Sequence, residues 1–370
     1  MNNINNLFFE LIQVAIVTRN CLSHTPIHST SSGQVLDEWG ELYAMAKKQS
    51  LVGVCFAAVQ KLCNSETSDY CGMNEMLYLT WMGMAAKIQQ RNQIVDELCV
   101  ALQRRLSAEG LSSCILKGQG VGQLYAEHLR GLRQSGDIDI YVPGGFRKVM
   151  SIAQKIAPVG KYTYVHAEWD VFEDTEVELH YRPSSQRNLM ANRRFQKWVK
   201  TFDATRFETR NGIIVPPLEF NRIYLLLHCY RHVIGAGIGL RQLMDYYFCL
   251  RNKELTTEDR DYNKTLLNHF GLYRFAGAVM HVLAEVYGLE GKYMICPPNK
   301  KEGEYLLKQT LIGGNFGRYD NRVKNNKDDS SIARKLFMNL RYALHYPGEL
   351  LWAPIWRVYA AYWKMTNRIN

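Results

Sequence analysis

The sequence predicts an α+β protein that is predominantly helical, with a small mixed β-sheet core flanked by N- and C-terminal helical regions. Three observations predict this class: helical apolar spacing before residue 110, short alternating segments between 111 and 215, and helical spacing again after Pro216-Pro217. We therefore expect four regions: an N-terminal helical region at 1–110, a sheet-containing nucleus of the fold at 111–215, a C-terminal helical domain at 216–300 and a basic, aromatic-rich helical tail at 301–370.

The composition is typical of a packed globular protein. Hydrophobic residues make up 47% of the 370 residues and charged residues 22%, which argues against general disorder. The apolar stretch 7–17 contains Glu10 and lacks a basic leader, so it predicts a core helix rather than a signal peptide or membrane span. The nine cysteines include no Cys-x-x-Cys pair. We expect reduced, buried thiols in a cytoplasmic protein and no zinc site.

The first 110 residues are expected to be helical, with loops at 24–33 and 64–72. The stretch 86–109 should deliver the chain to the first core strand and bury one face against the core. The apolar positions that predict this face are Ile88, Ile94, Leu98, Leu102 and Leu106.

The core is expected to alternate short strands and helices. Gly118 turns the chain after the first strand, and Pro143-Gly144-Gly145 ends the second strand. The expected strands are 112–116, 137–142, 162–167 and 177–181, and the expected helices are 121–129 and 146–156.

After the core the spacing is helical again. The segment 303–329 is polar and predicts a linker or mobile loop, and 235–239 predicts a flexible break. The expected helices are 220–232, 240–250 and 265–286.

The net charge of +10 is concentrated in the tail, where residues 301–370 hold twelve basic and six acidic residues. One interpretation is contact with an anionic partner, such as nucleic acid or a membrane surface, and the other is a solvated basic face. The aromatic residues between 346 and 363 either dock at a membrane interface or pack across the helical domain.

Two short strands hold the most informative acidic residues. Alternation places Asp137 and Asp139 on one strand face, roughly 6.6 Å apart at about 3.3 Å per residue. Glu178 and His180 share a face of a later strand in the same way. Two adjacent carboxylates need a cation between them or a proton on one of them, and hard divalent ions prefer such oxygen ligands. The alternative is a set of surface carboxylates beside a hydrogen-bonded structural histidine.

Other residues could contact a phosphate chain. Gly118 lets backbone N–H groups approach a phosphate. Arg133 could bind a phosphate through two N–H groups of its guanidinium, and Lys117 through the charge of its ammonium. Each of these two cations could equally be a surface residue. His228 and His232 lie on one helix face, but the segment between them lacks the Glu of a zinc protease helix. We expect these histidines to face the core or a cleft. Arg241 and Asp245 are four residues apart and are expected to pair.

These residues resemble the uncharacterised bacterial nucleotidyltransferase family, a branch of the DNA polymerase beta-like superfamily. Segments 225–232 and 240–245 look like the helical second half of that family. The motifs that match the family pattern are Leu116-Lys117-Gly118, Leu124-Tyr125, Arg133, Asp137-Ile138-Asp139 and Glu178-Leu179-His180-Tyr181.

The resemblance implies a Mg²⁺-dependent enzyme that moves an NMP group from an NTP to a hydroxyl of an acceptor and releases pyrophosphate. It implies that Asp137, Asp139 and Glu178 are the catalytic residues and the ligands of a two-metal site. The residues implied to contact the nucleotide are Lys117, Gly118, Arg133 and His180.

Two alternatives remain at this point. The superfamily usually has Ser or Gly directly after the turn glycine and often Asp as the third acid, whereas this chain has Gln119 and Glu178. A binding module with the same fold that has lost catalysis is therefore one alternative, with the basic tail contacting RNA, a membrane or a partner. The other is a metal-dependent glycosyltransferase, which needs a larger nucleotide-binding sheet before its Asp-x-Asp pair than about 110 helical residues allow.

Overall fold

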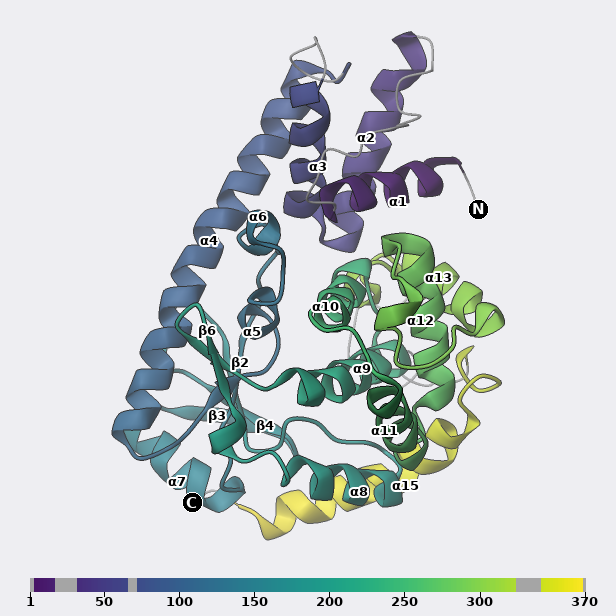
Figure 1. Cartoon of the computed structure of the whole chain (residues 1–370). Coiled ribbons are helices and arrows are strands. Elements are labelled where there is room, and N and C mark those ends of the chain that lie inside the picture. The colour runs from purple at the N-terminus through teal and green to yellow at the C-terminus, as the bar shows by residue number, and fades with distance from the viewer. Residues whose placement is uncertain (1–2, 17–31, 66–71, 324–340, 369–370) are drawn as a thin grey trace.

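The structure, a computed structural model, describes residues 3–16, 32–65, 72–323 and 341–368 (Figure 1). Helices predominate around one small sheet, which confirms the predicted fold class. The predicted loops at 24–33 and 64–72 lie largely outside the described residues. The helices before the first strand are α1 (Asn3–Ile16), α2 (Ser32–Gln49), α3 (Val52–Ser65) and α4 (Glu75–Ala108).

Helix α4 connects the N-terminal helices to the sheet. Its 34 residues correspond to about 50 Å at 1.5 Å per residue, and Figure 1 shows it running along one side of the molecule. The predicted helix at 86–109 is its second half. Ile94 is exposed, contrary to the prediction, because the buried face follows Val95 and Cys99 instead. The predicted buried positions Ile88, Leu102 and Leu106 are confirmed.

The sheet has five strands in the order β1-β2-β5-β4-β3. Only the central pair, β2 and β5, is parallel, and the other neighbours are antiparallel, so the predicted mixed sheet is confirmed. A separate hairpin follows it. The strand bounds are β1 (Cys114–Ile115), β2 (Ile138–Tyr141), β3 (Val159–Tyr162), β4 (His166–Trp169), β5 (Val177–His180), β6 (Glu208–Arg210) and β7 (Ile213–Val215).

Two predictions about the core were wrong in detail. The segment predicted as one strand at 162–167 forms the turn between β3 and β4, where the Thr163 N–H donates to the His166 carbonyl at 2.8 Å. The segment predicted as one helix at 121–129 instead contains parts of two single helical turns. The core helices are α5 (Gln119–Gly122), α6 (Glu127–Arg130), α7 (Phe146–Ile156) and α8 (Leu189–Val199).

The C-terminal helices follow the hairpin, and two predictions about them were wrong in detail. The predicted helix at 265–286 is two helices, because Gly271 adopts a positive φ of 68° between them. The predicted loop from 303 begins inside a helix, and its part from 324 to 329 lies outside the described residues. The helices are α9 (Leu218–Gly235), α10 (Leu240–Arg251), α11 (Thr257–His269), α12 (Tyr273–Tyr287) and α13 (Lys300–Gly313). Short 3₁₀ turns lie at Ala204–Arg206, Gly291–Tyr293, Asn315–Gly317 and Asn321–Val323.

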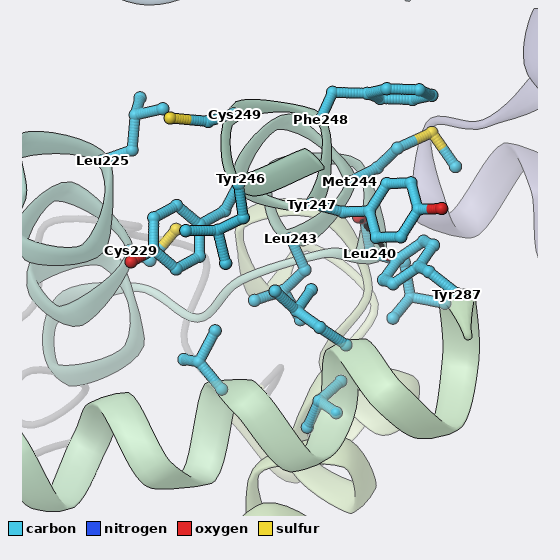
Figure 2. Close-up of a cluster of buried hydrophobic side chains, with 14 of the residues drawn as sticks. Leu225, Cys229, Leu240, Leu243, Met244, Tyr246, Tyr247, Phe248, Cys249 and Tyr287 are labelled. Carbon is cyan, nitrogen blue, oxygen red and sulfur yellow. Dashed lines mark hydrogen bonds between the residues drawn. The ribbon is translucent and has the colours of Figure 1, made fainter. Parts of the chain in front are cut away.

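Helix α10 lies between α9 and α12 and is buried on every side (Figure 2). The helix is also tied to its neighbours at its start and its middle, because the Tyr287 hydroxyl donates to the Leu240 carbonyl at 2.6 Å and the Tyr246 hydroxyl donates to the Arg222 carbonyl at 2.9 Å. Each large apolar side chain buried in this way contributes about 1.5–3 kcal/mol. Helix α10 is therefore a rigid support for the polar side chains that it directs toward the sheet.

The buried apolar side chains form two clusters. The larger one joins helices from both ends of the chain, from Phe8 to Tyr346, and the smaller one lies between the sheet, α4 and α7. The division into four regions stays a prediction. The free cysteines of the described part are all buried, as expected, but Cys63 is disulfide-bonded, so the expectation of reduced thiols throughout was wrong.

The last helix, α15 (Pro347–Thr366), crosses the base of the molecule beside α8 (Figure 1). Trp363 is buried against Phe146 and Tyr181, and Trp356 contacts Tyr164. These two tryptophans therefore pack on the sheet region, whereas Tyr346 contacts Tyr230 of α9 and so packs on the helical domain, as one of the two interpretations predicted. None of the helices in the described ranges combines the length and the apolar character needed to cross a membrane.

Candidate active site

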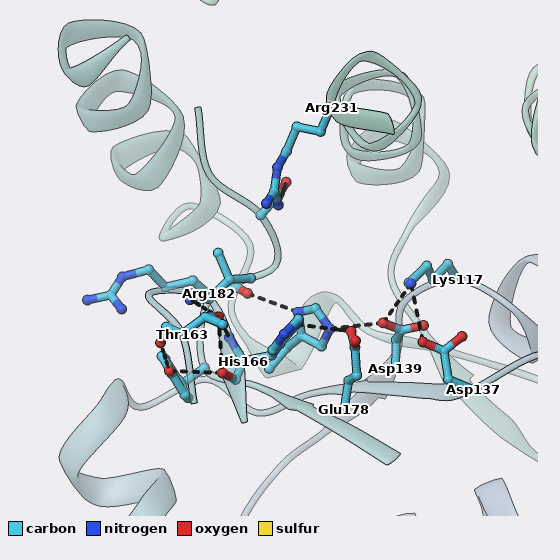
Figure 3. A network of polar contacts seen from close by, with 12 residues as sticks. Lys117, Asp137, Asp139, Thr163, His166, Glu178, Arg182 and Arg231 are labelled. Atoms are coloured by element: carbon cyan, nitrogen blue, oxygen red, sulfur yellow. Dashed lines mark hydrogen bonds and ion pairs between the residues drawn. The ribbon is translucent and has the colours of Figure 1, made fainter. Parts of the chain in front are cut away.

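Three carboxylates from two neighbouring strand segments converge on one face of the sheet (Figure 3). The parallel register places Asp139 of β2 opposite Glu178 of β5, and Asp137 lies just before β2. One ligand oxygen from each of the three lies within 4.8 Å of the others. The alternation predicted from the sequence thus brings these side chains together, because residues in register on adjacent strands share a face.

Asp139 is the most deeply buried of the three acids and is fully inaccessible. Its Oδ1 atom lies 3.0 Å from the Lys117 ammonium and 2.9 Å from His180 Nε2, whereas its Oδ2 atom is buried without a hydrogen-bond partner. Burial raises the pKa of Asp139 to about 6, although Lys117 opposes this shift. A buried carboxylate oxygen without a partner is costly, and a cation is a partner that would satisfy it.

The ammonium of Lys117 lies between the two aspartates, 3.0 Å from Asp139 Oδ1 and 3.7 Å from Asp137 Oδ2. Burial alone would lower its pKa, but the negative charges of Asp139, Asp137 and Glu178 hold the pKa above its ordinary value. Lys117 therefore supplies a positive charge next to the two aspartates, where the sequence predicts either a cation or a proton on one of them.

Glu178 and His180 share a face and contact one another, as predicted, at 3.2 Å. Burial opposes ionisation of Glu178, but hydrogen bonds from His166 and His180 hold its pKa well below the usual range. Burial would lower the pKa of His180, yet its hydrogen bonds to Asp139 and Glu178 raise the pKa. His166, which the sequence did not single out, lies with its Nδ1 atom 3.0 Å from Glu178.

The turn after β1 has a conformation that only glycine adopts readily. Gly118 has a φ of 59° and a ψ of −115°, and an added Cβ atom would approach the Asp137 carbonyl to 3.3 Å. This turn holds Lys117 beside the aspartates. Gln119, which replaces the Ser or Gly of the superfamily, is buried and donates to Asp96 of α4 at 2.7 Å. Its side chain thus anchors the turn to α4.

Arg133 is buried and forms a bidentate ion pair with Asp245 of α10, at 2.7 and 2.8 Å. The Tyr125 hydroxyl also donates to Asp245 at 2.7 Å. The predicted pair of Arg241 and Asp245 was wrong, since Arg241 donates instead to the Gln134 carbonyl at 2.6 Å. Arg133 lines the same small cleft as Gly118 and the two aspartates, and its assignment as a nucleotide ligand stays a prediction.

A larger cavity of about 480 Å³ opens beside the carboxylates and is lined by both Lys117 and Glu178. His228 and His232 line it, which confirms that they face a cleft. Arg231 projects from α9 above the site (Figure 3) and donates to Ser184 at 3.2 Å. Sequence patterns did not reveal the other basic residues of the lining, His166, Arg187 and Arg357, because they come from separate elements.

The comparison with protein families agrees with this geometry. The profile of a family described as an uncharacterised nucleotidyltransferase matches residues 36–288, which include the helices α4 and α10 and the whole sheet. No curated protein and no solved structure matches the chain. Because the matched region covers more than half of its length, the chain belongs to this uncharacterised nucleotidyltransferase family.

Proposed function

We propose that the protein transfers an NMP group from an NTP to a hydroxyl of an acceptor, with release of pyrophosphate and with divalent cations held by Asp137, Asp139 and Glu178. The observation that carries this proposal is the convergence of the three carboxylates, together with the buried Oδ2 atom of Asp139 that has no hydrogen-bond partner. A site of this kind fits a hard cation such as Mg²⁺, which prefers carboxylate oxygens. When bound, such cations would stabilise the charge that develops on the phosphates.

The basic lining of the cavity fits a polyphosphate. Lys117, Arg187 and Arg231 border the same space as Glu178, so the triphosphate would meet positive charge on the side facing the acids. Gly118 would allow the backbone of the turn to lie close to a phosphate. Lys117 would move from the aspartates toward the phosphates when a metal takes its place, since its ammonium is on a flexible stem.

Glu178 fits the role of a metal ligand better than that of a general base. Hydrogen bonds from His166 and His180 favour its ionised form and hold its pKa low. A carboxylate with a lowered pKa is a poor proton acceptor at neutral pH, because the best general bases have a pKa near the working pH. We therefore assign the third ligand position to Glu178.

A second candidate function is nucleotide binding without catalysis. Two observations favour it: the Lys117 ammonium already lies between the aspartates, and Gln119 is turned toward Asp96. In such a module Lys117 would permanently replace the metal. The glycosyltransferase alternative has no support, since six helices and a single two-residue strand precede Asp137 in the described part of the chain.

Transfer of label from NTPs tests the first proposal against the second. With α-labelled NTPs, Mg²⁺ and a set of hydroxyl acceptors that includes sugars, proteins and RNA, we expect labelled product that disappears when EDTA is added. Calorimetry with the same NTPs separates the alternatives. If the protein is an enzyme, NTP binding should depend on Mg²⁺. NTP binding that is the same with and without Mg²⁺, together with the absence of labelled product, would support the non-catalytic module. A cytoplasmic location also stays a prediction.

A further inference from the structure

We propose that His166, Glu178 and His180 form a second cation site beside the three carboxylates, and that this site takes a divalent transition metal such as Mn²⁺, Co²⁺ or Zn²⁺. This inference deepens the proposed function, on which it rests for the role of the metal. The binding site itself follows from the geometry of the two histidines and the glutamate.

The three ligand atoms lie close together on one face of the sheet, and Figure 3 shows His166 beside Glu178. His166 lies opposite His180 in the antiparallel pairing of β4 and β5, and the two rings are 5.0 Å apart between centroids. His166 Nδ1 is 3.0 Å and His180 Nε2 is 3.2 Å from the same oxygen of Glu178, and one ligand atom from each residue lies within 4.8 Å of the others. Three donors on two paired strands form a preorganised cluster.

The hydrogen bond between His180 Nδ1 and the Arg182 carbonyl determines which ring nitrogen can bind a metal. His180 Nδ1 is 3.2 Å from the Arg182 carbonyl, which can only accept, so Nδ1 must bear the hydrogen. The Nε2 atom of a neutral ring then presents its lone pair to the oxygens of Asp139 and Glu178, at 2.9 and 3.2 Å. Ionised carboxylates cannot donate. Either a proton or a metal ion must therefore lie among these atoms, and a backbone carbonyl that fixes the other nitrogen is typical of metal-bound histidine.

The donor set distinguishes this site from the carboxylate site. Asp137, Asp139 and Glu178 offer only oxygen, which suits Mg²⁺, whereas His166 and His180 offer imidazole nitrogen, which suits transition metals. Since Glu178 belongs to both sets, it would bridge the two cations. Asp139 adds a further buried carboxyl group, with its Oδ1 atom 2.9 Å from His180 Nε2 and its Oδ2 atom without a hydrogen-bond partner.

Titration of the metal-free protein with Co²⁺ tests the inference, because nitrogen ligands give characteristic visible absorption bands. We expect wild type to bind Co²⁺ with such bands and His166→Gln to lose at least about tenfold in Co²⁺ affinity. His269→Gln is the matched control, since this exposed histidine lies at the end of α11, outside the cavity lining. Calorimetry with Mn²⁺ and with Mg²⁺ should show a preference for Mn²⁺ that His166→Gln reduces.

Equal Co²⁺ affinity and spectra in wild type and His166→Gln would overturn the inference, as would a wild type that binds no Co²⁺ and holds a proton on His180 instead. The proposed function is measured separately, by label transfer in wild type with Mg²⁺ alone. Transfer without a nitrogen-ligated metal would leave the proposed function standing and remove only the second site. Binding of a nitrogen-ligated metal without transfer of label would support the second cation site and contradict the proposed function.

A different observation supports a second inference: we propose that α15 docks on an anionic membrane surface. Its aromatic residues Trp356 and Trp363 face the core, yet an apolar stripe remains exposed on another face. The stripe follows helical spacing. Its members and their exposed fractions are Leu351 at 72%, Ile355 at 47%, Val358 at 72%, Tyr362 at 64% and Met365 at 67%.

Charge complementarity selects the partner. The only charged residues from 350 to 368 are Arg357, Lys364 and Arg368, and all three are basic and exposed. On a helical wheel they lie on the side of the stripe opposite to Trp356 and Trp363. Arg357 also lines the cavity, and the Lys364 ammonium lies 5.0 Å from the centre of the Tyr162 ring. An amphipathic helix with these features binds anionic lipid through apolar insertion and charge attraction. A second copy of the chain would instead bring like charges together.

Co-sedimentation with vesicles tests this docking surface. We expect binding to equimolar phosphatidylcholine and phosphatidylserine vesicles, little binding to phosphatidylcholine alone, and weaker binding at high salt. Val358→Asp should weaken vesicle binding by about tenfold. Met76→Asp, at an equally exposed apolar position on α4, should not. Equal binding by both variants would overturn the inference, as would a stripe-dependent dimer in sedimentation experiments without lipid binding.

Discussion

Asp139→Asn is expected to abolish metal-dependent transfer, with a loss of about a thousandfold or more in turnover. Asp139 is the only acid of the three that is fully buried, and it contacts both Lys117 and His180. Asparagine keeps the size of the side chain but removes the negative charge, and a neutral amide is a weak ligand for a divalent cation. The measurement is label transfer from an α-labelled NTP at saturating Mg²⁺.

Glu168→Gln provides the matched control for this loss. Glu168 of β4 lies opposite Glu178 in the same sheet but is exposed, and it belongs to neither group of potential metal ligands. We expect transfer by Glu168→Gln at the wild-type level. Thermal unfolding followed by circular dichroism should show that both variants are folded. Wild-type turnover in a folded Asp139→Asn variant would rule out Asp139 as a metal ligand in the reaction.

The acidic part of the site could be predicted because its information is local. Asp137 and Asp139 alternate with Ile138 and Ile140, and the structure buries both isoleucines on the opposite face. A period of two is enough to place such side chains on one face of a strand. The pairing of β2 with β5 then brings Glu178 into register, which no local pattern specifies.

The sequence predicted His180 beside Glu178, but the position of His166 was missed because it depends on strand bounds and pairing. The segment 162–167 was predicted as one strand, but the chain turns at Thr163, so His166 begins a new strand. With those bounds, Ala167 and Trp169 face the core and His166 faces the carboxylates. Alternation from residue 166 would have suggested this face, but only the antiparallel pairing with β5 places His166 beside Glu178.

Sequence patterns also could not predict the partner of Arg133, because that contact depends on tertiary structure. Spacing within a helix predicted that Asp245 pairs with Arg241, whereas 112 residues separate Arg133 from Asp245. Helix α10 is buried on every side, so its polar residues must find partners in other elements. A local rule for exposed helices fails for a buried one, because tertiary contacts decide which charges meet.

Arg133→Met is expected to destabilise the protein by about 3–5 kcal/mol, because it leaves the Asp245 carboxylate buried without its bidentate partner. Urea denaturation measures the free energy of unfolding. The matched control is Arg210→Met, which removes the half-exposed pair of Arg210 with Glu208 and should cost at most about 1 kcal/mol. A cost as small as that of the control would contradict the structural role of Arg133.

The double variant Arg133→Met/Asp245→Leu separates this structural role from the role of nucleotide ligand. Replacing both members of a buried ion pair by apolar residues is often nearly neutral, so most of the lost stability should return. If Arg133 acts only through Asp245, the affinity for NTP should return with the stability. If its guanidinium contacts the triphosphate, the double variant should be stable but still bind NTP weakly, since methionine cannot replace the charge. The bidentate geometry and the burial of both partners favour the first outcome.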